Sequence, residues 1–192
     1  IEALGKMMSL KDLFTGDPAK ELEALRQQVG RLEKRQLDLL RLLQRLDPAC
    51  AALAAPDFAA QGYRICSKQD EDGLILHIFR QIGARNRTFV EIGVQDGLEC
   101  NTANLSRNLG WSGLLVEGDP DLANQARQNY AGFPGVRVEQ AFVTRENVNE
   151  ILARGGADLH CDLFSLDIDG NDYWIWEALE HFKPRVVVVE YN

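Results

Sequence analysis

Three aspartates close an apolar run in the stretch LFSLDIDGND, residues 163–172. Asp167 and Asp169 are two positions apart, so in an extended strand both side chains point to one side and Ile168 points to the other. A carboxylate in a cleft can take a proton from a substrate hydroxyl or bind a cation. A calcium loop is excluded, because counting from Asp167 puts glycine at position four and alanine at position twelve. The stretch therefore predicts a catalytic site, or else a turn that only ends a strand.

A glycine turn follows an earlier strand-like run, in the stretch EIGVQDG. Gly93 and Gly97 would let the backbone turn tightly and approach a ligand, beside the free N–H groups of a following helix. The dinucleotide pattern GxGxxG needs glycine where Gln95 stands, so binding of a pyrophosphate is disfavoured. Glu91 and Asp96 add negative charge, which suits a cationic group such as an amine or a sulfonium. A turn required only for packing is the alternative.

The next strand-like run ends in LLVEGDP. Glu117 comes 20 residues after Gly97, and a carboxylate at about this separation can accept hydrogen bonds from both hydroxyls of a ribose. Asp119 precedes Pro120, a pair typical of a turn or a helix start, so we assign Glu117 to the ribose and Asp119 to a helix cap. Phe142, at the end of the following run, is expected either to line an adenine slot or to pack in the core.

Five apolar runs must position these residues, and they lie at 88–94, 112–119, 136–143, 162–169 and 185–192. Helix-length segments separate them, which predicts βαβ units and a parallel sheet whose strands are covered on both faces. Ligands of such sheets bind at the carboxyl ends of the strands, near the point where the strand order reverses. We expect Asp172 to cap the helix after the fourth run, and Trp174 and Trp176 to pack that helix onto the sheet.

Together these motifs resemble the class I S-adenosylmethionine-dependent methyltransferases, and within them the FkbM-type family, over residues 63–192. The resemblance rests on the glycine turn, on Glu117, on LFSLDIDGND and on PRVVVVEYN, which begins at Pro184 and contains Glu190. It implies a Rossmann-like doubly wound sheet, S-adenosylmethionine as the cofactor, and methyl transfer to a hydroxyl oxygen, on a sugar or glycan. Sheets of that class have further strands, so the expected fold is the class I type truncated after its fifth strand.

The resemblance also implies roles for the residues of the site. Contacts to the cofactor are expected from Glu91, Gly93, Asp96, Gly97, Glu117 and Phe142. Asp167, with Asp169 beside it, is expected to act as a general base or a positioning carboxylate, and we favour this over Mg²⁺ held by Asp167 with Glu190 and Asn192. A methyltransferase-like scaffold without catalysis is the alternative function. A nucleotide-dependent dehydrogenase ranks third because of the glycine spacing.

A heptad pattern occupies residues 17–47, between an N-terminal segment, 1–16, and a linker rich in alanine and proline, 48–62. Its a positions are Leu22, Val29, Gln36 and Leu43, and its d positions are Leu25, Leu32, Leu39 and Leu46. Leucine at every d position and a single polar residue at a are typical of a parallel coiled coil. The pattern predicts self-association as a dimer. A trimer, or a helix folded back on its own domain, stays open.

Composition limits the classes of partner. The chain has 192 residues and a formal charge of -8, so a broad basic surface for nucleic acid or anionic lipid is not expected. The four cysteines include no CxxC pair, which disfavours a zinc site and a disulfide framework and favours reduced thiols in the cytoplasm. No apolar run approaches the roughly 20 residues that span a bilayer. Small-molecule and protein partners are therefore expected, and the glycan acceptor is implied by the family resemblance alone.

Overall fold

The computed structural model of the chain describes residues 26, 28–32, 35 and 58–190. The chain divides into two compact units, Ile1–Ala51 and Ala52–Asn192. In the first unit the described residues are helical and exposed, and they include Val29 at 52% and Leu32 at 58% exposure. The remaining heptad positions lie outside the described residues, so the coiled coil stays a prediction.

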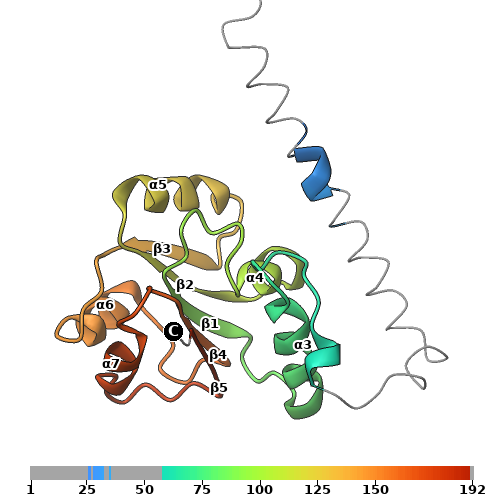
Figure 1. Ribbon diagram of the computed structural model, residues 1–192. Coiled ribbons are helices and arrows are strands. Elements are labelled where there is room, and N and C mark those ends of the chain that lie inside the picture. Colours follow the sequence, from blue (N-terminus) through green and yellow to red (C-terminus); the bar gives the residue numbers. More distant parts are fainter. Residues whose placement is uncertain (1–25, 27, 33–34, 36–57, 191–192) are drawn as a thin grey trace, which may run out of the picture. The chain divides into compact units, whose positions relative to one another are not determined.

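The second unit is built on one sheet of five parallel strands in the order β3-β2-β1-β4-β5 (Figure 1). The strands are β1 (Thr88–Ile92), β2 (Ser112–Glu117), β3 (Val136–Gln140), β4 (Leu163–Leu166) and β5 (Val186–Val189). All five predicted strands are confirmed, and each ends a few residues before its predicted carboxyl end. The order reverses between β1 and β4, which is the point where ligands of doubly wound sheets bind.

Helices cover both faces of this sheet, as the alternation of strands and helices predicts. They are α3 (Glu71–Ile82), α4 (Ala103–Leu109), α5 (Pro120–Asn129), α6 (Val148–Gly155) and α7 (Asp172–Glu177), preceded by the short 3-10 helix η2 (Ala59–Gln61). Figure 1 shows α6 and α7 on the opposite side of the sheet from α3 and α4. The Rossmann-like doubly wound architecture is therefore confirmed.

Two hydrophobic clusters form the core, one on each face of the sheet. Phe89 and Leu115 pack in the cluster that contains residues of α3 and α4, whereas Val90 and Leu114 pack in the cluster of α6 and α7. Neighbouring residues of a strand point to opposite faces, so each inner strand contributes to both clusters. The inner strands are buried along most of their length, while the edge strands β3 and β5 are only partly buried.

The expected role of Asp172 is wrong. Asp172 is the first residue of α7, and its side chain is not the cap of that helix. Instead, the buried carboxylate accepts hydrogen bonds from the N–H groups of Ile168 and Gly170, at 3.0 and 3.1 Å. Asp172 therefore closes the loop that connects β4 to α7.

The expected packing of the two tryptophans of α7 is also wrong. Trp174 is 51% exposed and Trp176 is 46% exposed, whereas Ile175 between them is buried. Successive helical residues are about 100° apart, so a short helix that buries Ile175 must turn its two neighbours away to either side. Ile175 is the residue that packs α7 onto the sheet.

No helix among the described residues is both long and apolar enough to cross a bilayer. Cys66, Cys100 and Cys161 are buried free thiols, and Cys50 lies outside the described residues.

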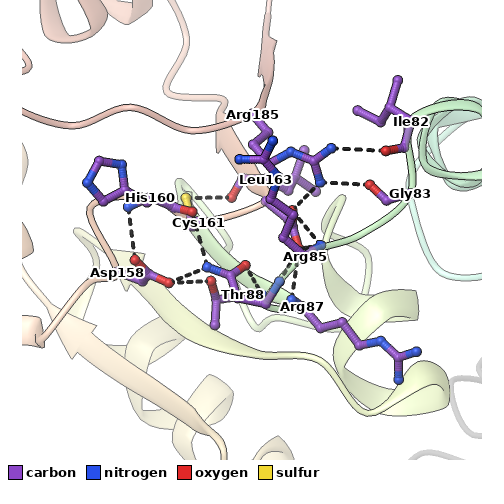
Figure 2. Close-up of polar contacts among 12 residues, drawn as sticks. Ile82, Gly83, Arg85, Arg87, Thr88, Asp158, His160, Cys161, Leu163 and Arg185 are labelled. Atoms are coloured by element: carbon purple, nitrogen blue, oxygen red, sulfur yellow. Dashed lines mark hydrogen bonds and ion pairs between the residues drawn. The ribbon is translucent and has the colours of Figure 1, made fainter.

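A buried carboxylate connects the segments that precede β1, β4 and β5, at the amino-terminal ends of these strands. Asp162, just before β4, is fully buried and accepts hydrogen bonds from the backbone N–H groups of residues 85–87 and from the guanidinium of Arg185, which is 2.7 Å away. Arg185 also donates to the carbonyls of Ile82 and Gly83 (Figure 2). Burial alone would raise the pKa of Asp162, but these hydrogen bonds outweigh it and lower the pKa.

We expect Asp162→Asn to lower the free energy of unfolding by about 2–4 kcal/mol at pH 7, because it removes a buried charge that several donors face. The folded-state pKa of Asp162 is lowered, so its contribution is present above the unfolded-state pKa of about 3.9 and is lost as the pH falls through the folded-state pKa. Urea denaturation of both proteins from pH 7 to pH 3 measures this difference. The exposed Asp121→Asn is the control, and a pH-independent difference would contradict the assignment.

Candidate functional site

Two adjoining cavities lie at the carboxyl ends of the strands. The β5-side cavity, of about 380 Å³, is lined by the ends of β1, β4 and β5 and includes Glu91, Asn101 and Glu190. The β2-side cavity, of about 330 Å³, lies beside the end of β2 and the loop after β3. Both cavities share a wall made of Lys68, Gly93, Gln95 and Asp167. The shared wall lies where the strand order reverses, as expected for a ligand site.

Gly93 allows the carboxyl ends of β1 and β4 to meet. Its backbone has φ of 85°, and a Cβ atom at this position would overlap with the carbonyl oxygen of Asp167. Its N–H group donates to the carbonyl of Val116 on the other neighbouring strand, at 2.9 Å. Glycine is therefore required here by packing, and the same close approach places Gly93 in the shared wall.

Glu91 is buried, and both of its oxygens already have partners within the chain. They accept hydrogen bonds from the N–H groups of Asn101 and Thr102 at 2.8 Å, from the Thr102 hydroxyl at 2.6 Å and from the Ser165 hydroxyl at 3.2 Å. This carboxylate thus holds the segment that leads into α4. It also lines the β5-side cavity, and its expected contact with a ligand stays a prediction.

Glu117 ends β2 and lines the β2-side cavity. One of its oxygens accepts from the N–H of Gln95 at 2.6 Å, and the other accepts from the N–H of Asp119 at 2.9 Å. A carboxylate oxygen can accept a second hydrogen bond, so both retain capacity for a ligand. The expected cap is confirmed, because Asp119 accepts from the N–H groups of Asp121 and Leu122 at the start of α5.

Of the other residues predicted to contact the cofactor, Phe142 and Asp96 line a cavity and Gly97 does not. Phe142 is 77% exposed and lines the β2-side cavity, so its alternative role in the core is excluded. Asp96 lines the β5-side cavity, and its side chain accepts from the N–H of Leu98 at 3.0 Å. Gly97 is buried and lines neither cavity, and its backbone packs against the ring of Tyr130.

Asp167 is the centre of a carboxylate cluster in the shared wall. Carboxylate oxygens of Asp167, Asp169 and Glu190 lie within 4.8 Å of one another. The ammonium of Lys68 is 3.9 Å from the carboxylate of Asp167. Partial burial and the charge of Glu190 raise the pKa of Asp167 to about 6, although the charge of Lys68 acts in the opposite direction.

The predicted magnesium ligands were Asp167, Glu190 and Asn192. Asn192 lies outside the described residues, and the structure brings Asp169 to the other two carboxylates instead. Hard oxygen donors of this kind suit Mg²⁺, but acidic clusters at a surface are common without a metal. The magnesium site therefore stays a prediction.

Sequence reasoning missed Lys68. The residue precedes α3, and its segment reaches the site because Asp72 holds it in place. The buried carboxylate of Asp72 accepts from the backbone N–H groups of residues 65–67 at 2.6–2.8 Å. Burial raises the pKa of Asp72 despite these hydrogen bonds. The charged stretch SKQDEDG was a visible signal, but only the fold brings Lys68 opposite Asp167.

No protein-family model and no curated protein matches the chain. Among solved structures, the chain is similar to the O-methyltransferase from Bacillus cereus in complex with SAH, at 21% identity and a TM-score of 0.44, covering 77% of this chain and 62% of that one. It is also similar to the CurJ carbon methyltransferase, at 11% identity and a TM-score of 0.45, covering 89% and 50% of the two chains.

A third similar structure is a SAM-dependent methyltransferase from Aquifex aeolicus, at 13% identity and a TM-score of 0.40, covering 57% of this chain and 58% of that one. In all three cases this chain spans less than two thirds of the length of the other protein. A function for the chain must therefore be proposed from the residues of its own two cavities.

Proposed function

We propose that the chain binds S-adenosylmethionine across the two cavities and transfers its methyl group to a hydroxyl oxygen of a small molecule or glycan. The observation that carries this proposal is the placement of Glu117. Its carboxylate is fixed by two backbone N–H groups at the end of β2 and faces a cavity beside the glycine turn. A carboxylate in this position suits the two hydroxyls of a ribose.

The charges around the shared wall support a cationic ligand part. Asp167, Asp169 and Glu190 bring three carboxylates together, and the ammonium of Lys68 lies 3.9 Å from the carboxylate of Asp167. In the proposed arrangement the ribose lies on Glu117, the adenine lies against the exposed ring of Phe142, and the sulfonium lies at the shared wall. A dinucleotide would instead place its phosphates near these carboxylates, which like charge disfavours.

Asp167 is the proposed base. The acceptor oxygen forms a bond to the methyl carbon while the bond from that carbon to sulfur breaks, and the electron pair of the broken bond stays on sulfur. The hydroxyl proton passes to the carboxylate of Asp167. A pKa of about 6 leaves Asp167 mostly ionised at neutral pH and makes it a stronger base than an ordinary aspartate. In this proposal Asp169 and Lys68 orient the acceptor.

The binding step is tested by calorimetric titration with S-adenosylmethionine and with S-adenosylhomocysteine. We expect the wild-type chain to bind both ligands and Glu117→Ala to bind each about tenfold more weakly or worse, because hydrogen bonds to a charged group contribute roughly 1.5–3 kcal/mol. Glu150→Ala, on the exposed side of α6, is the control and should keep wild-type affinity. Absence of heat with either ligand in the wild-type chain would sink the proposal.

The catalytic step is tested with Asp167→Asn. We expect the rate of S-adenosylhomocysteine formation with a panel of hydroxyl-bearing acceptors to fall by about 10²–10⁴-fold, while affinity for S-adenosylhomocysteine, which has no sulfonium charge, changes little. The wild-type rate should also fall as the pH drops through about 6, where the pKa of Asp167 lies, because a protonated carboxylate cannot accept the proton. Asp169→Asn, whose side chain is more exposed, should have the smaller effect.

The same assay separates the base from the magnesium alternative. If Asp167, Asp169 and Glu190 hold a cation that orients the acceptor, a chelator should abolish the reaction and added Mg²⁺ should restore it. With Asp167 as the base alone, the chelator should have no effect. Full activity of Asp167→Asn would contradict both roles.

A second proposal is that the chain self-associates as a parallel coiled coil, which would serve either an enzyme or an inactive scaffold. Val29 and Leu32 occupy successive a and d positions of the heptad pattern. Both are in a helical segment and are about half exposed in a single chain. Apolar residues at these positions are typically covered by a partner helix. A second copy of the same chain supplies the matching pattern.

We expect Leu32→Glu to convert the wild-type assembly to monomers, because it places a charge at a d position of the seam. Light scattering of the purified chain measures the molar mass. Gly30→Glu is the matched control, since Gly30 lies at a b position and a Cβ atom there meets nothing within 4 Å. That variant should keep the wild-type mass. A monomeric wild-type chain would mean that the heptads do not drive self-association.

A further inference from the structure

The glycine turn after β1 is hydrogen-bonded to the end of α5, which belongs to the next βα unit. The carbonyl oxygen of Asp96 accepts a hydrogen bond from the side-chain amide of Asn129, at 2.9 Å. The carbonyl oxygen of Gly97 accepts a hydrogen bond from the hydroxyl of Tyr130, also at 2.9 Å. Asn129 is the last residue of α5 and Tyr130 is its C-cap, so two adjacent side chains bind two adjacent carbonyls.

Tyr130 packs its ring against the turn in addition to donating the hydrogen bond. Its ring is buried, and a Cβ atom on Gly97 would lie 2.7 Å from the ring edge. The hydroxyl has a second polar neighbour, the hydroxyl of Ser106 at 3.2 Å. Burial raises the pKa of Tyr130, so its hydroxyl keeps its proton and remains a donor at neutral pH. The Gly97 carbonyl has one other donor, the weak thiol of Cys100 at 3.7 Å.

The turn needs outside support because its backbone is strained. Gln95 has φ of 53°, in the left-handed region that residues other than glycine rarely adopt. Such a conformation costs free energy and persists only where surrounding contacts hold it. The N–H of Gln95 donates to Glu117, so residues 95, 96 and 97 are each held by the unit formed by β2 and α5.

We propose that Asn129 and Tyr130 are positioning residues that clamp the glycine turn in the conformation competent for binding the cofactor. Neither residue lines the β5-side or the β2-side cavity, so both act through the turn. The clamp also aligns the shared wall with the carboxylate of Glu117, since Gln95 belongs to the wall and is hydrogen-bonded to that carboxylate. The identity of the ligand rests on the function proposed above, whereas the effect on the turn does not.

The first test needs no ligand. Amide hydrogen exchange of the folded chain is measured for the wild type, for Tyr130→Phe and for Asn129→Ala. Tyr130→Phe keeps the ring against Gly97 and removes only the hydroxyl. We expect faster exchange in residues 95–98 in both variants, by about two- to tenfold, because each loses one neutral hydrogen bond to the turn.

The second test is calorimetric titration of the same proteins with S-adenosylhomocysteine. We expect affinity to fall by about two- to tenfold in each variant, because the competent turn is a smaller fraction of the free protein. In a steady-state assay with an identified acceptor, KM for S-adenosylmethionine should rise in each variant while kcat changes little. A bound cofactor favours the competent conformation of the turn, so the bound state should differ less from the wild type. A purely structural role for Tyr130 would not separate the two constants in this way.

Three control variants separate the clamp from general destabilisation. Tyr173→Phe removes an exposed hydroxyl from α7, and Asn124→Ala removes an exposed amide from α5 itself. Thr88→Val removes a hydrogen bond of 2.8 Å to Asp158 at the amino-terminal end of β1, far from the turn, and we expect it to lower thermal stability. All three should keep wild-type affinity and wild-type exchange in residues 95–98.

Unchanged exchange and unchanged affinity in both Tyr130→Phe and Asn129→Ala would overturn the clamp. Equal losses in Thr88→Val would overturn it too, because they would trace the effect to stability alone. If the wild-type chain binds no S-adenosylhomocysteine, the proposed function fails, and the exchange measurement still decides the clamp by itself.

Discussion

The contact between the carboxyl ends of β1 and β4 is the constraint on which the rest of the site depends. Gly93 and the carbonyl of Asp167 meet so closely that no side chain fits between them. This contact joins the two halves of the sheet at the point where the strand order reverses. The connections that follow β1 and β4 lead to helices on opposite faces of the sheet, so they leave a space at the carboxyl ends of these two strands. Both cavities share a wall there.

Buried carboxylates hold loops at both ends of the sheet, Asp72 and Glu91 near this junction and Asp162 at the amino-terminal ends of the strands. Asp72, Glu91 and Asp162 are buried, and each accepts hydrogen bonds from at least two backbone N–H groups of a neighbouring loop. A buried charge is costly unless donors surround it, so each of these residues requires its loop to keep one conformation. Glu117 and Asp167 differ from Asp72 and Asp162 because they line cavities, as Glu91 also does, where a ligand can reach their oxygens.

Many acidic residues can lie close together in the site because some of their charges are offset by nearby donors. Glu91 has its charge satisfied by the start of α4, and Asp167 has Lys68 opposite it. What remains is the cluster of Asp167, Asp169 and Glu190, in which Asp167 is partly buried and the other two residues are exposed. Partial burial and the nearby charge of Glu190 raise the pKa of Asp167 to about 6, which suits the proposed role of a base.

By itself the sequence determined that the sheet has five parallel strands with helices on both faces, because alternating apolar runs and helical segments admit few other arrangements. It also placed Glu117 and Asp167 at strand ends and Asp119 at a helix start, since these are local patterns of residue type and spacing. The ends of strands were less predictable. A strand ends where it separates from its neighbours in the sheet. The residues of one strand do not indicate where this separation occurs.

Only the tertiary structure decided which residues meet. Lys68 reaches Asp167 from a segment about a hundred positions earlier, and Tyr130 reaches Gly97 from the end of another helix. Ile175 rather than Trp174 and Trp176 packs α7, because the direction in which a short helix faces is set by the sheet beneath it. Contacts between distant segments depend on how elements stack in space, and residue type and spacing along one segment do not contain that information.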